Sequence, residues 1–552
     1  MKIIYQNIRQ TFLYRKQLFL KNKHLTILVL LAFILWITIS VYAAGSFEFS
    51  EGEDEVIGIK NAMRVADSYR KPFSLLAALT VERPPLSFLV GVPFLWFLPV
   101  TEFTLRLPYV IFGILQLPLV FGISYHLFGR RASGVATLLF ITSGLFAINR
   151  LTLGISVFIF LELLAFYWFV IFAKFGKGNR IVWSFLATLA ATLTFQDGAM
   201  FALSLGVMAV IVAGLSREVL IGISLYVFGL ITYAMAVICS IYLQTLWFDR
   251  AFQFFEIGAI NHLIGRSRGV HFSNILDLEY FQTIAYYISV PLSALLIIGL
   301  LLIIINFRRS ERIAVYWTLG FVLPHFVVWQ FLSSRLEHPV FIFPVLSILA
   351  ATGLCHAFDV LKNKILQGFG LLLVGFVLLI SLFWNQFYFN HPNWALESGK
   401  YRLIYELQQM FPRGHGMLEV SGYRTVAFLV RDIGGPADKI YLPDGMSGAI
   451  GYYSARAVET LPKGPTNTSD LQSLDGFLVL PSGSNFVSLH WGLLKTYDHY
   501  QISKKDAPLL LVFDMRKNKL KTFKTWSLDV EDYDKRFIDR YNSMSDFLIR
   551  SK

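Results

Sequence analysis

The chain has 552 residues, of which 55% are hydrophobic and 16% aromatic, and its mean hydropathy is +0.57. These values exclude an ordinary soluble domain and indicate a protein with many membrane-spanning helices. The formal net charge of +13 is typical of a membrane protein with Lys and Arg near its cytoplasmic helix ends, so it does not argue for a nucleic-acid partner.

Apolar runs of about twenty residues recur along the chain and predict about eleven transmembrane helices. Residues 1–24 are basic and precede the first run, which is too long for a signal-peptide core and is interpreted as a retained span. The runs at 181–196 and 199–214 are short enough to form one long or broken helix. Spans are expected near residues 25–45, 107–127, 133–151, 154–173, 181–196, 199–214, 219–245, 284–306, 312–332, 338–358 and 366–387.

Basic residues in the loops orient these spans. With a cytoplasmic N-terminus, every internal loop carries Lys or Arg, as the positive-inside rule requires. A further span at 85–99 would move most of these charges to the other side. We therefore predict an interfacial or re-entrant helix at 85–99, with an ordinary short span as the alternative. The internal loops then carry Arg130, Arg131, Lys174, Lys177, Arg180, Arg217, Arg308, Arg309, Arg312, Lys362 and Lys364.

Three segments face outside on this map. Two are external loops, at 46–106 and 246–283, within a membrane domain that covers 25–387. The third, 388–552, has a mixed composition, turn signals such as Pro443-Asp444-Gly445, and β-like runs at 476–480 and 509–513. This pattern predicts an extracytoplasmic α/β domain.

Ionisable residues gather on the outer face. Glu53-Asp54-Glu55 directly follows the first span, and carboxylates beside a bilayer usually mark a functional site. A carboxylate can act as a general base, and clustered Arg side chains can bind phosphate through charge-assisted hydrogen bonds. The other outer groups are Glu82-Arg83-Pro84-Pro85, Arg106, Asn149-Arg150, Gln196-Asp197, His262, Arg266, Arg268, His271 and Ser334-Arg335-Leu336-Glu337-His338.

Each of these groups also has a purely structural explanation. An acidic stretch in an external loop can be solvated surface, and residues 82–83 can form a local ion pair. Arg150 and Arg335 can be interfacial anchors, and Arg266 with Arg268 can bind anionic lipid headgroups. A functional site is favoured because all of these groups fall on one side of a map that was drawn from the internal charges.

The outer motifs resemble the bacterial and archaeal protein O-mannosyltransferase and aminoarabinose-transferase group, which are GT-C fold glycosyltransferases that use polyprenyl-phosphate sugars. Four matches, spread over roughly residues 25–358, carry the resemblance. They are Asp54-Glu55 after the first span, Glu82-Arg83-Pro84-Pro85-Leu86, the pair Arg106-Leu107-Pro108 and Leu127-Phe128-Gly129-Arg130-Arg131, and Ser334-Arg335-Leu336-Glu337-His338 with Pro344.

The resemblance implies roles for individual residues. Asp54 would be the catalytic carboxylate, with Glu55 as its neighbour or substitute. Arg83 would contact the lipid-linked phosphate, helped by Arg266, Arg268 or Arg335. Glu82 would help to ligate a divalent metal, with His262 as its partner. The two cysteines, Cys239 and Cys355, lie inside apolar runs, which argues against a Cys-based metal site.

The prediction is therefore a polytopic α-helical membrane protein, GT-C-like, with a C-terminal extracytoplasmic α/β domain. It would be an inverting glycosyltransferase of the plasma (inner) membrane that transfers a sugar from a polyprenyl-phosphate donor to a lipid, glycan or protein hydroxyl outside. One departure from the family is that residues 150–156 contain no acidic residue. The alternatives are a secondary transporter and a non-catalytic receptor or assembly platform that binds through 388–552.

Overall fold

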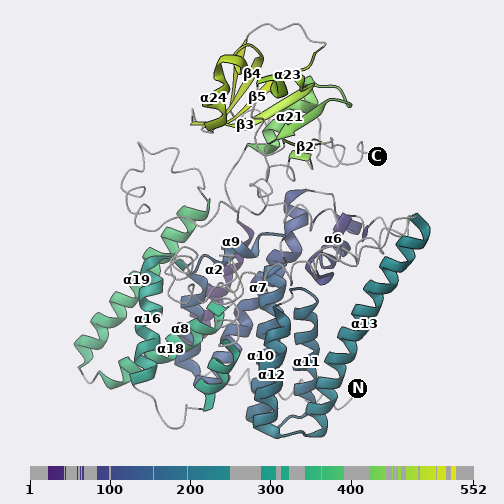
Figure 1. Cartoon of the computed structure of the whole chain (residues 1–552). Coiled ribbons are helices and arrows are strands. Elements are labelled where there is room, and N and C mark those ends of the chain that lie inside the picture. Colours follow the sequence, from purple (N-terminus) through teal and green to yellow (C-terminus); the bar gives the residue numbers. More distant parts are fainter. Residues whose placement is uncertain are drawn as a thin grey trace.

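A bundle of long helices and a smaller unit built on a β-sheet make up the computed structural model (Figure 1). The sheet unit lies against one end of the bundle, which we call the domain-facing end. The structure describes residues 23–42, 44, 59, 62–63, 65–66, 84–98, 101–152, 154–195, 197–248, 288–305, 313–322, 342–361, 363–390, 422–442, 450–451, 454, 458–461, 468–482, 485–504, 507–517 and 524–529.

Helices between residues 23 and 390 form the bundle. Of the described helices, five are long and apolar enough to cross a membrane: Glu102–Phe128, Ile155–Phe175, Arg217–Ser240, Phe343–Val360 and Lys364–Asn385. The helices of the bundle are α2 (Lys23–Val41), α7 (Glu102–Phe128), α8 (Arg130–Ile141), α9 (Leu145–Asn149), α10 (Ile155–Phe175), α11 (Asn179–Thr192), α12 (Gly198–Ala213), α13 (Arg217–Phe248), α16 (Val290–Ile305), α18 (Phe343–Val360) and α19 (Lys364–Asn390).

The span predicted at 133–151 is not one continuous helix. It breaks between α8 and α9, where Ser143 and Gly144 are poor helix formers. The side chain of Asn385 in α19 donates a 2.7 Å hydrogen bond to the carbonyl oxygen of Thr142, which satisfies one of the free carbonyls at the end of α8. The two runs at 181–196 and 199–214 form two separate helices, α11 and α12, and not one long or broken helix.

The segment predicted to be interfacial or re-entrant forms two short helices, α5 (Leu86–Leu89) and α6 (Val92–Phe97). Pro85 precedes the first helix, Val90 and Gly91 lie between the two, and Pro93 lies in the first turn of the second. Twelve residues of helix would rise about 18 Å, well short of a hydrocarbon core of about 30 Å. The segment is thus too short for the ordinary span that was the alternative.

Basic side chains lie at the end of the bundle opposite the domain-facing end, and we call this the basic end. Tight turns join the helices there through Gly129, Gly176 and Gly214, which have positive φ angles. The Arg131 guanidinium pairs with the carboxylate of Asp359 at 2.9 Å and so links α8 to α18. The described basic residues at or near these turns include Arg130, Arg131, Lys174, Lys177, Arg180, Arg217 and Lys364, a segregation that agrees with the positive-inside rule.

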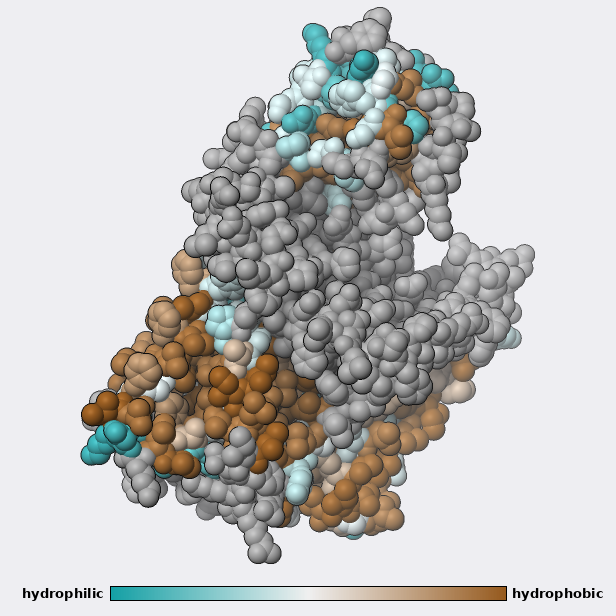
Figure 2. All heavy atoms as spheres, turned by 60° about the vertical axis from the view of Figure 1, so that its left-hand side comes forward, coloured by the Kyte–Doolittle hydropathy of each residue, from teal (hydrophilic) through white to brown (hydrophobic). Residues whose placement is uncertain are grey.

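Apolar side chains, brown in Figure 2, dominate the described surface of the bundle on the face shown there. Leu372 is 74% exposed, Phe383 68% and Ile211 75%. Soluble proteins rarely expose contiguous apolar surface on this scale, whereas lipid-facing helices do. Together with the apolar helices, this surface indicates an integral membrane protein.

Helices α16 and α18 cross with their backbones in contact. A Cβ atom added to Gly353 would lie 1.8 Å from the carbonyl oxygen of Gly299. Small residues at such a crossing allow close packing of membrane helices.

We therefore expect Gly353→Leu to lower the free energy of unfolding by about 2 kcal/mol or more, because the side chain must push the two helices apart. Thermal unfolding of the purified protein in detergent measures the effect. Gly368→Leu in α19 is the matched control, since nothing lies within 4 Å of an added Cβ there. Equal melting temperatures for the two variants would show that the crossing is not tight.

The sheet unit lies within the residues expected to form an α/β domain. Its six strands run in the order β2-β1-β3-β5-β4-β6. β1 is parallel to β2 and β3, β5 is antiparallel to β3 and β4, and β6 is parallel to β4. The strands are β1 (Lys439–Leu442), β2 (Val458–Thr460), β3 (Gly476–Pro481), β4 (Asp498–Lys504), β5 (Ala507–Asp514) and β6 (Thr525–Asp529), and the helices are α21 (Tyr423–Ile433), α23 (Thr468–Ser473) and α24 (Asn485–Leu494).

Both β-like runs named from the sequence are strands, β3 and β5. They pair with each other, with Val479 opposite Val512. Every residue of β3 except its last is buried, so the run is apolar throughout rather than alternating, as expected for a strand covered on both faces.

Candidate active site

The eight residues to which the sequence assigns a role lie outside the described residues. They are Asp54, Glu55, Glu82, Arg83, His262, Arg266, Arg268 and Arg335, and their roles stay predictions. The structure does describe the residues that flank the segment 45–83, which contains four of them. The hydrogen bonds of these flanking residues fix the positions of the two ends of the segment.

Two buried arginines hold the start of this segment. The Arg106 guanidinium in α7 donates a 3.1 Å hydrogen bond to the carbonyl oxygen of Ala44. The Arg150 guanidinium, just after α9, donates a 2.8 Å bond to the carbonyl oxygen of Tyr42. Both side chains are almost fully buried, at 2% and 1% exposed. They meet the C-terminal end of α2, where free carbonyls and the helix dipole favour cations.

Arg150 is therefore not an interfacial anchor in contact with lipid, which was the structural alternative for it. Its guanidinium also lies over the ring of Phe146, 5.3 Å from the ring centroid. A planar cation held between a carbonyl and an aromatic ring has one fixed position. This fixed position makes Arg150 a structural support for the exit of α2.

The end of the segment is held as firmly. The hydroxyl of Tyr109 in α7 donates a 2.9 Å hydrogen bond to the carbonyl oxygen of Ser87 in α5. The backbone N–H of Leu86 donates to the carbonyl oxygen of Leu193, at the end of α11, also at 2.9 Å. A Cβ atom on Gly154 would approach the Cβ of Ser87 to 2.8 Å, so the turn before α10 packs directly on α5. Pro84 and Pro85, which directly precede α5, therefore have a fixed position.

One face of α7 makes most of these contacts. Arg106 and Tyr109 are three residues apart and hold the two ends of the segment 45–83. Residues spaced three or four apart share a helix face. The same spacing continues through Glu102, Arg106, Tyr109, Gly113 and Gln116, each of which makes a contact to another element.

The inner part of this face is a buried polar layer. The indole N–H of Trp36 in α2 donates to the carbonyl oxygen of Gly113 at 3.1 Å. The side-chain amide of Gln116 exchanges 3.2 Å hydrogen bonds with that of Asn149, and donates a 2.9 Å bond to the carbonyl oxygen of Ser156. Satisfied polar groups of this kind fix the relative position of α2, α7, α9 and α10.

Of the residues on this face of α7 and in the buried polar layer, the sequence analysis named only Arg106 and Asn149 as candidates. Hydropathy marks α7 as a span, but it does not show that the polar positions within the helix share one face. The signal that could have found them is the spacing of Glu102, Arg106, Tyr109 and Gln116.

A second group that the sequence reading missed is Glu162, which is 1% exposed within α10. An ionisable residue inside an apolar helix is a functional-site candidate in its own right. The signal is a single carboxylate in a run of 21 residues that is otherwise apolar apart from Ser156 and Lys174.

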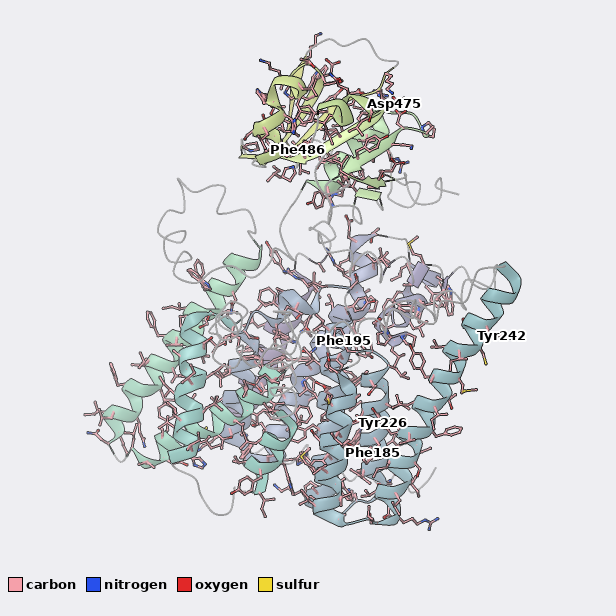
Figure 3. The ribbon with its side chains drawn as sticks, in the orientation of Figure 1. Phe185, Phe195, Tyr226, Tyr242, Asp475 and Phe486 are labelled. Atoms are coloured by element: carbon pink, nitrogen blue, oxygen red, sulfur yellow. The ribbon has the colours of Figure 1, made fainter. Side chains whose placement is uncertain are left out.

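Asp197, which was named in the outer set, is 7% exposed at the start of α12. The neighbouring Phe195 contacts Phe158 of α10, with ring centroids 5.5 Å apart. Figure 3 shows Phe195 nearer to the C-terminal domain than Phe185 of α11. Asp197 therefore lies toward the domain-facing end, like Arg106 and Arg150.

No group of three or more His, Cys, Asp or Glu side chains suited to a metal ion is present among the described residues. Glu82 and His262, the two metal ligands implied by the resemblance, are outside them. The described part of the site consists instead of buried arginines, neutral hydrogen-bonding groups and the carboxylates of Glu102 and Asp197.

The arrangement defines a fold. A bundle of apolar helices carries, at one end, a buried polar layer that holds the residues flanking the segment 45–83, and a separate α/β unit lies against that end. This is the fold of the GT-C glycosyltransferases.

Solved structures carry this assignment, since neither a family model nor a curated protein matches the sequence. The crystal structure of ArnT from Cupriavidus metallidurans in the apo state aligns with a TM-score of 0.53 at 14% identity, over 88% of this chain and 97% of that one. The same protein bound to undecaprenyl phosphate aligns with a TM-score of 0.52, also at 14% identity, over 88% and 97%. The oligosaccharyltransferase of Archaeoglobus fulgidus tethered with an acceptor peptide aligns at 0.51 and 12% identity, over 84% of this chain and 70% of that one.

Proposed function

We propose that this protein is an inverting membrane glycosyltransferase that uses a polyprenyl-phosphate sugar. The single observation that carries the proposal is the anchoring of both ends of the segment 45–83 by Arg106 and Tyr109 on one face of α7. The shared fold with ArnT, which has been solved with undecaprenyl phosphate bound, supports a lipid-phosphate donor.

The proposed chemistry needs one base and a set of cations. The Asp54 carboxylate removes the proton from the acceptor hydroxyl as its oxygen attacks the anomeric carbon. The bond from that carbon to the phosphate oxygen breaks, and polyprenyl phosphate leaves with the electron pair. Arg83, with help from Arg266, Arg268 or Arg335, neutralises the charge that develops on the phosphate.

The side of the membrane is part of the proposal. Apart from the buried Arg106 and Arg150, the described basic residues of the bundle gather at the basic end, which the positive-inside rule assigns to the cytoplasm. The domain-facing end, with the segment 45–83, then faces outward from the plasma (inner) membrane. The acceptor would be a hydroxyl of a lipid, glycan or protein, and a divalent metal held by Glu82 and His262 would assist phosphate binding.

A substitution at Arg83 tests the donor site. We expect Arg83→Met to raise the KM for a polyprenyl-phosphate sugar by about tenfold or more, because a charge-assisted hydrogen bond to the phosphate contributes about 1.5–3 kcal/mol. Initial rates measured in lipid nanodiscs over a range of donor concentrations give the KM. Arg217→Met, an exposed arginine at the basic end, is the control. An unchanged KM for Arg83→Met would remove this residue from the donor site.

The transporter alternative predicts a different result in the same material. A transporter moves its substrate without breaking the bond between sugar and phosphate, and it keeps ionisable groups near the bilayer midplane. Most of the described ionisable groups of the bundle lie instead toward its two ends, which favours the transferase. Among the described residues, Glu162 is the ionisable group that a transporter would use. If Glu162→Gln transfers sugar to the acceptor at the wild-type rate, the transporter alternative is excluded.

A further inference from the structure

The C-terminal domain is joined to α7 by an ion pair. The Arg424 guanidinium in α21 donates a 2.7 Å hydrogen bond to the carboxylate of Glu102, which lies 322 positions earlier in the chain. Both side chains are largely buried, at 14% and 8% exposed. Buried pairs are held in one geometry more strictly than exposed ones, because either partner alone would leave a desolvated charge.

The local position of Arg424 indicates that it serves the contact rather than its own helix. It is the second residue of α21, where the positive end of the helix dipole disfavours a cation. Glu102 is the first residue of α7, where the same effect favours a carboxylate. The ion pair therefore stabilises the contact between the N-terminal ends of α7 and α21.

Apolar contacts surround this pair. Leu105 in α7 and Ile59 belong to the same buried cluster as Val426 and Phe428 of α21. Ile59 is one of the few described residues of the segment 45–83, five positions after Asp54. The core of the C-terminal domain thus continues into the segment that carries the proposed base.

Glu102 also lies on the face of α7 that anchors this segment. It precedes Arg106 by four residues, and Arg106 holds Ala44. A shift of the C-terminal domain would act on α7 at Glu102 and on the segment at Ile59. The domain and the acidic segment are therefore supported by the same first turns of one helix.

We propose that the C-terminal domain is a positioning element of the catalytic face, and that the Glu102–Arg424 pair sets its position. Neither residue touches the substrate in this scheme. Each acts by holding the domain and the segment 45–83 in one arrangement, in which Asp54 reaches the acceptor hydroxyl. The inference rests on the proposed transferase function.

The test compares Glu102→Gln, Arg424→Met and the exchanged double variant Glu102→Lys with Arg424→Glu in the full-length protein. Sugar transfer in nanodiscs gives kcat and the donor KM for each, and thermal unfolding gives stability. We expect each single variant to lose about tenfold in kcat with the donor KM within about twofold of wild type, and the exchanged pair to recover most of the loss. Lys439→Met, which breaks the exposed pair with Glu459 in the same domain, is the control and should keep wild-type kinetics.

A merely structural pair would behave differently. It would lower the melting temperature without changing kcat at temperatures where the protein stays folded, and that result would overturn the proposal. No recovery in the exchanged variant at wild-type stability would overturn it as well. Failure of the proposed function itself is distinguishable, because it would appear as absent transfer in the wild-type protein.

Discussion

Asp54→Asn is expected to abolish sugar transfer while the protein still inserts and folds. Asparagine has nearly the same size but cannot accept the proton of the acceptor hydroxyl, and loss of a general base typically lowers the rate by about 10²–10⁴-fold. Transfer from a polyprenyl-phosphate sugar, measured at saturating donor, gives the loss in kcat. The donor KM should change little, because the phosphate contacts are assigned to arginines.

The neighbouring carboxylates provide the controls for this experiment. Glu53→Gln should keep transfer within about threefold of wild type, since the proposed chemistry assigns no role to Glu53. Glu55→Gln distinguishes the two roles predicted for Glu55. In one it only neighbours the catalytic Asp54, and in the other it can replace Asp54 as the base. If Asp54→Asn turns over at the wild-type rate, Asp54 is not the base.

Arg150→Met is expected to cause the second large loss, in both stability and transfer. The substitution removes the bond to the Tyr42 carbonyl oxygen and the contact with Phe146. A hydrogen bond from a charged group contributes about 1.5–3 kcal/mol. Removing the buried cation also relieves its desolvation cost and the repulsion from the nearby Arg106, which offsets part of this. We expect a net loss of about 2 kcal/mol in unfolding free energy, measured by thermal unfolding in detergent.

For this variant, the rate of sugar transfer should fall by more than the smaller folded fraction alone would explain, because a loosened α2 also releases the start of the segment 45–83. Arg150→Lys should recover part of both, since an ammonium can still reach one carbonyl but does not reproduce the planar contact with Phe146. Arg217→Met, exposed at the basic end, is the matched control and should leave both unchanged. Wild-type transfer by Arg150→Met would show that the exit of α2 does not matter for catalysis.

Hydropathy and loop charges predicted much of the helical part of the fold. Lipid contact selects for long apolar runs, so α7, α10, α18 and α19 could be located from composition alone. The hydrogen bond that satisfies the Thr142 carbonyl at the break between α8 and α9 could not, because its donor Asn385 comes from a helix about 240 residues later. Local sequence contains no trace of such a partner.

The candidate site, too, could be predicted from the sequence only in part. Arg106 and Arg150 could be placed on one side of the membrane from topology, yet their burial and their bonds to the exit of α2 depend on how three helices meet. The docking of the C-terminal domain could not be predicted either, since Glu102 and Arg424 lie 322 positions apart in the chain. Contacts between distant parts of the chain are what the three-dimensional structure adds.

The central claim is that this chain breaks the bond between a sugar and a polyprenyl phosphate. The most direct measurement incubates purified protein in nanodiscs with a polyprenyl-phosphate sugar and an extract of cell-envelope acceptors, and quantifies polyprenyl phosphate by mass spectrometry. We predict one polyprenyl phosphate for each sugar transferred, in a new linkage of inverted anomeric configuration. Recovery of the donor intact, with every acceptor fraction tried, would contradict the account.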